Sequence, residues 1–283
     1  MEVKSYGKIN LSLDVISKRD DGYHNIETIM QKINLYDIMK FEKIEKGFVL
    51  NIDDNTLSNG KDNLIYKSWK LLCDYTKKEL PIKIDLKKNI PIAAGLAGGT
   101  GNGATTLKAL NEIYNLNIND EKLMEISLSL GADFPYMICG GTVLAKGIGE
   151  KIEKLDDFSN VNILVINPGF GVSTKDVYEG LTLTDKKIKS KELIENLKYK
   201  DIDKLENLLY NKMEDTVFEK HSEIKDIKKR LELLNGIALM SGSGATVFSF
   251  FKNDDDLDKA YNYFIKLYPK TYKTYTVGGY YEF

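Results

Sequence analysis

The stretch Pro91–Leu107, PIAAGLAGGTGNGATTL, contains five glycines between Gly95 and Gly103 and leads into a helix-like run, ATTLKALNEIYNL. Glycine is unfavourable in helices and strands because it loses the most backbone freedom on folding, so this cluster marks backbone with a special task. The preceding run LPIKIDLKKNIP has the pattern of a strand. A strand, a glycine loop and a helix N-terminus in this order are typical of phosphate binding, because free amides and the helix dipole attract an anion.

Three phosphate-binding patterns and a simple packing turn are alternatives for this loop. The Walker A pattern is excluded because no Gly-Lys-Ser/Thr occurs there. Gly99, Gly101 and Ala104 fit the dinucleotide pattern G-x-G-x-x-G/A, but the preceding glycines and the missing parallel βαβ pattern argue against that fold. The third pattern, P-x-x-x-G-L-x-G-G-S/T-S/T, fits PIAAGLAGGTG better, and it resembles the phosphate loop of the GHMP kinases.

Three further segments carry the same resemblance, in the order in which the family has them. They are GKINLSLDVISKRDDGYHNIETIM near the N-terminus, GADFPYMI in the middle and LMSGSGATVFSFF near the C-terminus. The KRDDGYH segment is the most specific, and it resembles the branch of the family that acts on 4-diphosphocytidyl-2-C-methyl-D-erythritol in non-mevalonate isoprenoid synthesis. The resemblance spans the whole chain and implies an ATP- and Mg²⁺-dependent kinase that phosphorylates the 2-hydroxyl of this small molecule.

The composition is that of an ordinary soluble globular protein, with 42% hydrophobic and 29% charged residues among 283. Because the net charge is −2, we expect neither nucleic acid nor an anionic membrane as a partner. Cys73 and Cys139 are far apart and the two histidines form no HExxH pattern, so neither a disulfide framework nor a zinc site is expected. No run of about 18 apolar residues and no signal-peptide pattern occurs, which predicts a cytoplasmic protein, a monomer or a homodimer.

Strands and helices follow one another without regular βαβ alternation, which predicts an α+β chain. The buried-looking strand VNILVINPG suggests a second domain, so we predict domains at 1–157 and 158–283. The run NLIYKSWKLLCDYTKK predicts a helix capped by Asp62 or Asn63. Another helix is predicted from about Gly103 to Leu116. The family resemblance implies an N-terminal domain like domain 2 of ribosomal protein S5 and a ferredoxin-like C-terminal domain, with the active site between them.

Two residues match the catalytic positions of the family. Asp133 follows Gly131 and precedes Pro135, so it lies in a bend, where a carboxylate commonly makes local turn hydrogen bonds. The resemblance implies instead that Asp133 is the base that accepts the proton of the substrate hydroxyl. Lys8, which is otherwise a solvated lysine at a strand end, is implied as the partner that keeps Asp133 ionised and activates the hydroxyl.

The phosphate loop must work with lysines and backbone amides, because Arg19 and Arg230 are the only arginines. Amides from Gly95 to Gly103 are expected to hold the β- and γ-phosphates, and Thr100 is the candidate hydroxyl for phosphate or Mg²⁺. The family's usual Ser-Ser-Asp-Ala-Ala is Thr-Gly-Asn-Gly-Ala here, so one hydroxyl is lost and the first helical turn is weakened. The residues implied in ATP or phosphate binding are Pro91, Ala93, Ala94, Gly95, Leu96, Ala97, Gly98, Gly99, Thr100, Gly101, Asn63 and Lys88.

The expected substrate contacts are two aromatic groups and three polar side chains. Tyr23 and His24 match the residues that contact cytosine in the family, by stacking and by hydrogen bonding. Tyr178 falls where the family has an aromatic ring opposite the first, and Asn10 and Thr174 match polar contacts. Each of these residues is as readily explained as a partly buried aromatic or a satisfied turn residue. The loop SGSGATV is expected near the substrate phosphates or against the first glycine loop, although a tight β-hairpin is an alternative.

Two other functions remain open. A GHMP kinase for another alcohol, such as homoserine or mevalonate, would share the glycine loops but not the DGYH segment. A non-catalytic nucleotide- or RNA-binding protein on the same scaffold would explain the altered TGNG loop, but not the presence of Lys8 and Asp133.

Overall fold

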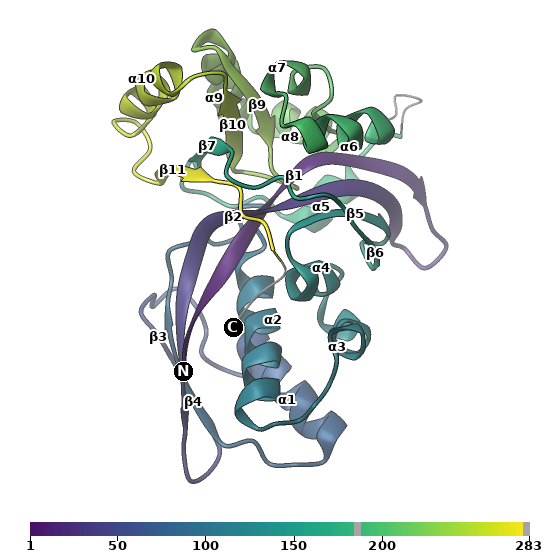
Figure 1. The fold of residues 1–283 in the computed structure, drawn as a ribbon, viewed down its shortest axis with the longest axis vertical. Coiled ribbons are helices and arrows are strands. Elements are labelled where there is room, and N and C mark those ends of the chain that lie inside the picture. The colour runs from purple at the N-terminus through teal and green to yellow at the C-terminus, as the bar shows by residue number, and fades with distance from the viewer. Residues whose placement is uncertain (184–187, 280–283) are drawn as a thin grey trace.

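Two β-sheets organise the computed structural model, which describes residues 1–183 and 188–279 (Figure 1). The first sheet has seven strands, in the order β3-β4-β2-β1-β8, with β5 paired to β2 and β6 paired to β5. Its strands are β1 Glu2–Lys18, β2 His24–Lys43, β3 Phe48–Ile52, β4 Ile82–Lys87, β5 Thr142–Gly147, β6 Lys151–Lys154 and β8 Tyr210–Asn211. The β1–β8 and β3–β4 pairs are parallel and the other pairs antiparallel, so this is a mixed sheet.

β1 and β2 are the longest strands of the fold, and their hairpin runs from the N-terminus beside β3 and β4 to the side of the molecule where β5 and β6 lie (Figure 1). Its register shifts at three points along β1, at Tyr6/Gly7, Asn10/Ser12 and Val15/Ser17. Such irregularities bend a strand and increase its twist. A bent hairpin can contact both halves of the molecule. Of the β1 residues that line the cavity, Lys8, Asn10 and Leu13 lie in the middle part of the strand and Lys18 lies at its end.

Four helices cover the first sheet: α1 Leu64–Thr76, α2 Gly98–Ile113, α3 Asp120–Ser127 and α4 Phe134–Cys139. Asn63 caps α1 and Asn119 caps α3, and each side chain accepts a hydrogen bond from a backbone amide of the first turn. The prediction that α2 begins near Gly103 is wrong, because the helix already begins at Gly98. Glycine lowers helix propensity but does not forbid a helix, and close packing of α2 against its neighbours outweighs that local preference.

The second sheet has the order β11-β7-β10-β9 and is antiparallel throughout. Its strands are β7 Asn162–Ile166, β9 Gly236–Met240, β10 Val247–Phe251 and β11 Thr271–Tyr275. The helices of this half are α5 Thr174–Glu179, α6 Ser190–Tyr199, α7 Ile202–Leu205, α8 Met213–Lys220, α9 Ser222–Leu233 and α10 Asp254–Phe264. The polar run TDKKIKSKELIENLKYKDIDKLENLLYNKME has helical spacing in the sequence and predicts surface helices. Its first four residues, 184–187, lie outside the described residues, and the remainder contains α6, α7 and the short strand β8.

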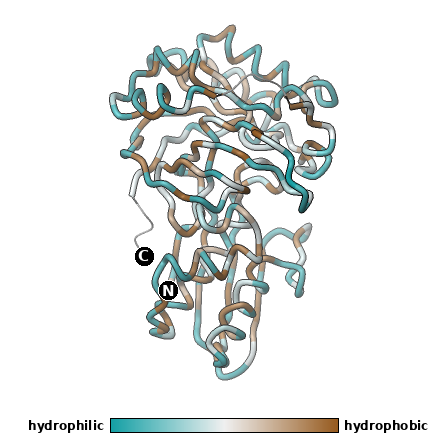
Figure 2. The backbone as a smooth tube through the Cα atoms, turned by 90° about the vertical axis from the view of Figure 1, so that its right-hand side faces the viewer, coloured by the Kyte–Doolittle hydropathy of each residue, from teal (hydrophilic) through white to brown (hydrophobic). Residues whose placement is uncertain are grey.

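The two halves share hydrophobic packing. One buried cluster joins Ile9 and Ile29 of the first sheet to Val165 and Phe250 of the second. Along the tube in Figure 2, hydrophobic and hydrophilic residues alternate through the strands and helices, as expected for elements with one buried face. The structure therefore confirms the predicted α+β class. Among residues 1–183 and 188–279, no helix has the length and apolar character needed to cross a bilayer.

Candidate active site

A cavity of about 1250 Å³ is lined by residues from both halves of the chain. Its walls come from β1, the β1–β2 turn, the first glycine loop, the start of α4, α5 and the second glycine loop. The predicted site residues that line it are Lys8, Asn10, Tyr23, His24, Asn63, Lys88, Pro91, Ala93, Ala94, Gly95, Ala97, Gly98, Gly99, Thr100, Asp133, Thr174 and Tyr178. Two predicted residues, Leu96 and Gly101, are buried and are not part of its lining.

The N-terminus of α2 opens onto this cavity. Ala97 precedes the helix in the left-handed conformation, and the first helical hydrogen bond runs from the Gly101 amide to the Ala97 carbonyl (2.8 Å). The amides of Gly98, Gly99 and Thr100 therefore have no acceptor within the helix and are available to an anion. The expectation that free amides extend to Gly103 is corrected, because Gly101 and the residues after it use their amides inside α2.

The second glycine loop packs against the first, as one of the two predicted placements had it. Ser241 Oγ donates a hydrogen bond to the carbonyl of Gly95 (2.9 Å), and the Thr246 amide donates to the carbonyl of Ala94 (3.4 Å). Gly95 has φ +76°, and a Cβ at this position would collide with the Ser241 carbonyl. The left-handed backbone and the close approach together require glycine at this position.

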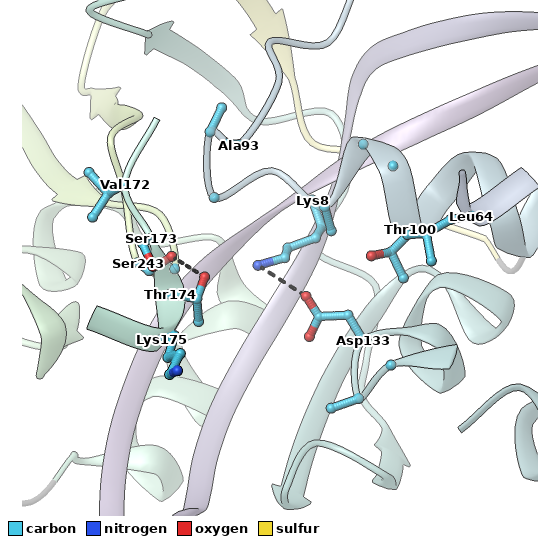
Figure 3. A pocket seen from close by; sticks show the side chains of 18 of the residues that line it. Lys8, Leu64, Ala93, Thr100, Asp133, Val172, Ser173, Thr174, Lys175 and Ser243 are labelled. Atoms are coloured by element: carbon cyan, nitrogen blue, oxygen red, sulfur yellow. Dashed lines mark hydrogen bonds and ion pairs between the residues drawn. The ribbon is translucent and has the colours of Figure 1, made fainter. Parts of the chain in front are cut away.

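Lys8 and Asp133 face each other across the cavity (Figure 3), with Lys8 Nζ 3.9 Å from Asp133 Oδ2. The Lys8 side chain is 5% exposed and that of Asp133 is 42% exposed, so the pair connects a buried cation to an open carboxylate. Burial lowers the pKa of Lys8, and the charge of Asp133 opposes this shift. Asp133 immediately precedes α4 and its side chain makes no capping hydrogen bond, which leaves its oxygens available to a ligand.

A buried chain of hydrogen bonds holds Lys8 in place. Lys8 Nζ donates to Asn10 Oδ1 (2.6 Å), Asn10 Nδ2 donates to Thr28 Oγ1 (2.8 Å), and Thr28 donates to the Ser12 carbonyl (2.6 Å). Both polar atoms of the Asn10 side chain are engaged in this chain. Asn10 therefore orients Lys8 in the structure and also lines the cavity.

The three predicted aromatic residues line the same cavity. The ring of Tyr178 stacks on His24, with centroids 4.9 Å apart and planes at 18°. Tyr23 is 59% exposed at the turn of the β1–β2 hairpin. A base that stacked on the same face of Tyr178 would have to displace the His24 ring.

The ionisation of both stacked rings is shifted toward the neutral form. Burial lowers the pKa of His24, with Lys18 contributing, so the imidazole is mainly neutral at pH 7. Burial raises the pKa of Tyr178 to about 12, with the charge of Asp133 adding to the effect, so the phenol keeps its proton. Two neutral rings with polar edges suit the recognition of an uncharged heterocycle.

Asn63 and Lys88 line the cavity, but each has internal partners. Asn63 Oδ1 accepts from the Ile65 amide (2.8 Å) and its Nδ2 donates to the Ser58 carbonyl (2.6 Å). Lys88 forms a buried ion pair with Asp37. Both side chains are thus committed to supporting the cavity wall, whatever further contact they make with a ligand.

Thr174 Oγ1 lies 2.8 Å from Ser243 Oγ, and this pair closes the cavity on the side opposite Asp133 (Figure 3). The sequence analysis did not select Ser243, although it lies inside the glycine loop that was selected. It also missed Asp37 and Asn102. The signal for Asp37 was present, because a carboxylate replaces an apolar residue in the alternating run of β2.

The donor set for a metal ion is small. Among the described residues, no group of three His, Cys, Asp or Glu side chains could hold a metal. Thr100 and Asp133 both project into the cavity beside the α2 N-terminus (Figure 3). Magnesium commonly keeps several waters and binds through one or two carboxylates and the phosphates of a nucleotide, so this site fits a nucleotide-bound magnesium.

Two family descriptions match the chain. The GHMP kinases N terminal domain matches residues 63–141, and the GHMP kinases C terminal domain matches residues 193–270. A 4-diphosphocytidyl-2-C-methyl-D-erythritol kinase of Clostridium botulinum is 43% identical over 95% of this chain and 96% of its own. The enzyme of the same name from Clostridium beijerinckii is 42% identical over 98% of this chain and 100% of its own.

Solved structures also resemble this chain. A crystal structure of 4-(cytidine 5'-diphospho)-2C-methyl-D-erythritol kinase has a TM-score of 0.84 at 28% identity, covering 99% of this chain and 100% of that chain. A homoserine kinase from Cytophaga hutchinsonii has a TM-score of 0.73 at 16% identity, covering 99% and 95%. At that identity, the second match shows only a shared fold.

Proposed function

The chain belongs to the GHMP kinases, and we propose that it transfers the γ-phosphoryl group of ATP to the 2-hydroxyl of 4-diphosphocytidyl-2-C-methyl-D-erythritol. Relatives that bear the name of this activity match nearly the full chain at above 40% identity. The single structural observation that carries the proposal is the position of Lys8 and Asp133 beside the open N-terminus of α2, in one cavity.

We propose Asp133 as the base that accepts the proton of the substrate hydroxyl. Its oxygens are exposed to the cavity, and the ammonium of Lys8 lies 3.9 Å from Oδ2. A hydroxyl between the two groups can donate to the carboxylate and accept from the ammonium, which orients it for attack. The low exposure of Lys8 strengthens its field at this point, because little water screens it.

ATP supplies the phosphoryl group, and the first glycine loop has the geometry to hold its phosphates. The free amides of Gly98, Gly99 and Thr100, together with the α2 dipole, provide donors without any arginine. Thr100 is the proposed hydroxyl ligand of a phosphate-bound Mg²⁺. The glycines at 101 and 103, which depart from the family pattern, lie within α2 on its buried side, after the three residues whose amides are free.

The cytidine end of the substrate is proposed to bind at Tyr23, His24 and Tyr178. This part of the cavity has neutral aromatic faces and polar edges, whereas the glycine loops have amides and hydroxyls. Thr174 and Asn10 would then contact the part of the substrate between the base and the reacting hydroxyl. The free thiols of Cys73 and Cys139 are compatible with the proposed cytoplasmic location.

The deciding experiment is a coupled ADP-release assay with Mg-ATP and four alcohols: the cytidine compound, homoserine, mevalonate and galactose. ADP release with the cytidine compound alone is the expected result. Turnover of homoserine or mevalonate instead would identify another GHMP kinase. If a folded protein that binds ATP released no ADP with any of the four alcohols, kinase activity on this panel would be rejected. Binding of RNA by the same sample would then favour the non-catalytic alternative.

A further inference from the structure

Asp37 is a fully buried carboxylate in the middle of the first sheet. On β2 it stands between Leu35 and Met39, and these residues, together with Phe41 further along, form the alternating buried face of the strand. An ionisable group at such a position is costly unless several donors surround it. A buried carboxylate in this apolar row therefore needs a structural reason.

The donors come from two segments on either side of the glycine loop. Asp37 Oδ1 accepts from the amides of Asn89 and Ile90, both at 2.8 Å. Asp37 Oδ2 accepts from Lys88 Nζ and, at 2.9 Å, from Asn102 Nδ2. Lys88, Asn89 and Ile90 precede the glycine loop in the chain, and Asn102 belongs to α2, the helix that follows it.

Asn102 also joins this cluster to β1. Its Nδ2 donates to Ser5 Oγ (3.0 Å), and its Oδ1 accepts from Lys88 Nζ (3.3 Å). The approach of α2 depends on Gly101, since a Cβ at that position would lie 3.0 Å from the Tyr6 carbonyl. The Gly101–Asn102 pair, which departs from the family's loop pattern, thus lets α2 approach β1 closely enough for these bonds.

The position of Lys88 relates this cluster to the α2 N-terminus. A Cβ placed on Gly98 would lie 3.1 Å from Lys88 Nζ, so the ammonium lies directly beside the first residue of the helix. An unpaired ammonium there would be repelled by the positive end of the α2 dipole. Asp37 supplies the compensating charge and keeps Lys88 beside the loop.

We propose that Asp37 is a positioning residue for nucleotide binding, which holds both ends of the glycine loop through Asn89, Ile90 and Asn102. The inference rests on the proposed function, because it takes the loop to be the ATP-phosphate site. One carboxylate fixes where the loop begins and where α2 starts, so the free amides are arranged before the nucleotide arrives. Preorganisation of this kind increases affinity by lowering the ordering cost of binding.

The first test is Asp37→Asn, which keeps the size of the side chain and removes its charge. We expect the KM for ATP and the Kd for ADP, measured by calorimetry, to rise about tenfold or more, the scale of one charge-assisted hydrogen bond. The KM for the alcohol should stay within about twofold, because Asp37 is distant from the aromatic end of the cavity. Asp85→Asn is the matched control, since Asp85 lies on β4 and bonds Asn51 (2.6 Å) away from the loop.

A second variant, Asn102→Ala, keeps the Asp37–Lys88 pair and cuts the link to α2. Asn102→Ala should also raise the Kd for ADP. In the double variant with Asp37→Asn, the Kd should rise by less than the product of the two single increases. Unchanged ADP affinity in both folded variants would overturn the proposal. Equal increases in the KM of both substrates with a lowered Tm would also overturn it, by assigning Asp37 a general structural role.

The two proposals fail in different ways. Wild-type protein that binds ADP but phosphorylates no alcohol would contradict the proposed function, while ADP affinity of the variants would still test Asp37. Wild-type turnover with the cytidine compound and unchanged ADP affinity in both variants would contradict the role of Asp37 alone.

Discussion

At the residue scale, Asp133 has an exposed carboxylate that makes few contacts with the rest of the described protein. Among the described residues it makes no capping hydrogen bond, and its ion pair with Lys8 is long. We therefore expect Asp133→Asn to lower kcat by about 10²–10⁴, the range for loss of a general base. The free energy of unfolding should fall by less than about 1 kcal/mol, because the ion pair with Lys8 is long and half-exposed on the Asp133 side, and Lys8 keeps its hydrogen bond to Asn10.

Asp120→Asn is the control for this variant. Asp120 is a similarly exposed aspartate in an ion pair with a lysine, Lys108 (3.5 Å), at the start of α3 and outside the cavity lining. It should change neither kcat nor stability appreciably. Undiminished turnover in the Asp133 variant would remove this residue as the base.

The buried Lys8 predicts that its contribution to the free energy of unfolding rises with pH. Burial lowers its pKa in the folded protein, whereas in the unfolded chain the value is about 10.4. Between these two values the unfolded chain binds more protons, so the contribution of Lys8 to the free energy of unfolding rises with pH. The free energy of unfolding of the wild type, minus that of Lys8→Met, should therefore increase as the pH rises toward the unfolded value of about 10.4.

The exposed Lys70 gives the comparison. Lys70 donates a hydrogen bond to Asp74, and this bond raises the pKa of Lys70. Its stabilising contribution is therefore present below the unfolded pKa and lost as the pH rises through the folded pKa. The corresponding difference for Lys70→Met should not increase with pH. A flat or falling difference for Lys8→Met, measured by urea denaturation, would contradict the lowered pKa.

At the element scale, the glycines of α2 have separate tasks. A Cβ on Gly103 would lie 2.6 Å from Phe134 Cζ and 2.9 Å from Ser68 Oγ, whereas the nearest atom at Gly99 is Leu64 Cδ1 at 3.8 Å. Alanine favours a helix over glycine by about 1 kcal/mol, but overpacking costs about 1–3 kcal/mol. Gly103→Ala should therefore lower the free energy of unfolding.

Gly99→Ala is the matched substitution in the same helix, with space for the new methyl group. It should leave the free energy of unfolding unchanged or raise it by up to about 1 kcal/mol. Urea denaturation monitored by circular dichroism measures both variants. Equal effects of the two substitutions would show that contacts with α1 and α4 do not determine the choice of glycine at 103.

At the scale of the whole molecule, the shared hydrophobic cluster couples the two halves. Trp69 on α1 is the single tryptophan of the chain, so its fluorescence reports on the first half, while circular dichroism reports on both. We expect the two signals to follow one urea transition. Phe250→Ala, a buried change in the second sheet, should lower the stability reported by Trp69 by about 3–5 kcal/mol.

Separate midpoints for fluorescence and circular dichroism would contradict this coupling. So would a Trp69 transition that is unaffected by Phe250→Ala. Either result would support independent folding of the predicted domains 1–157 and 158–283, whose boundary remains a prediction.

Local signals in the sequence determined the class of the fold and the order of the main elements. Strand alternation, a cap of α1 at Asp62 or Asn63 and the glycine loop between strand and helix depend on neighbouring residues, so they could be predicted directly. The resemblance to a known family then indicated Lys8 and Asp133. The cavity confirms that these distant residues meet, but their roles remain proposals.

Only the tertiary structure decided which glycines leave amides free and which allow close packing. It also decided that Tyr178 stacks on His24 and that Asp37 pairs with Lys88 and Asn102. These contacts join residues far apart in the chain, and Asn102 and Asp37 are separated by 65 positions. Local propensity carries no information about such pairs, because their geometry arises only when the β1–β2 hairpin and α2 pack together.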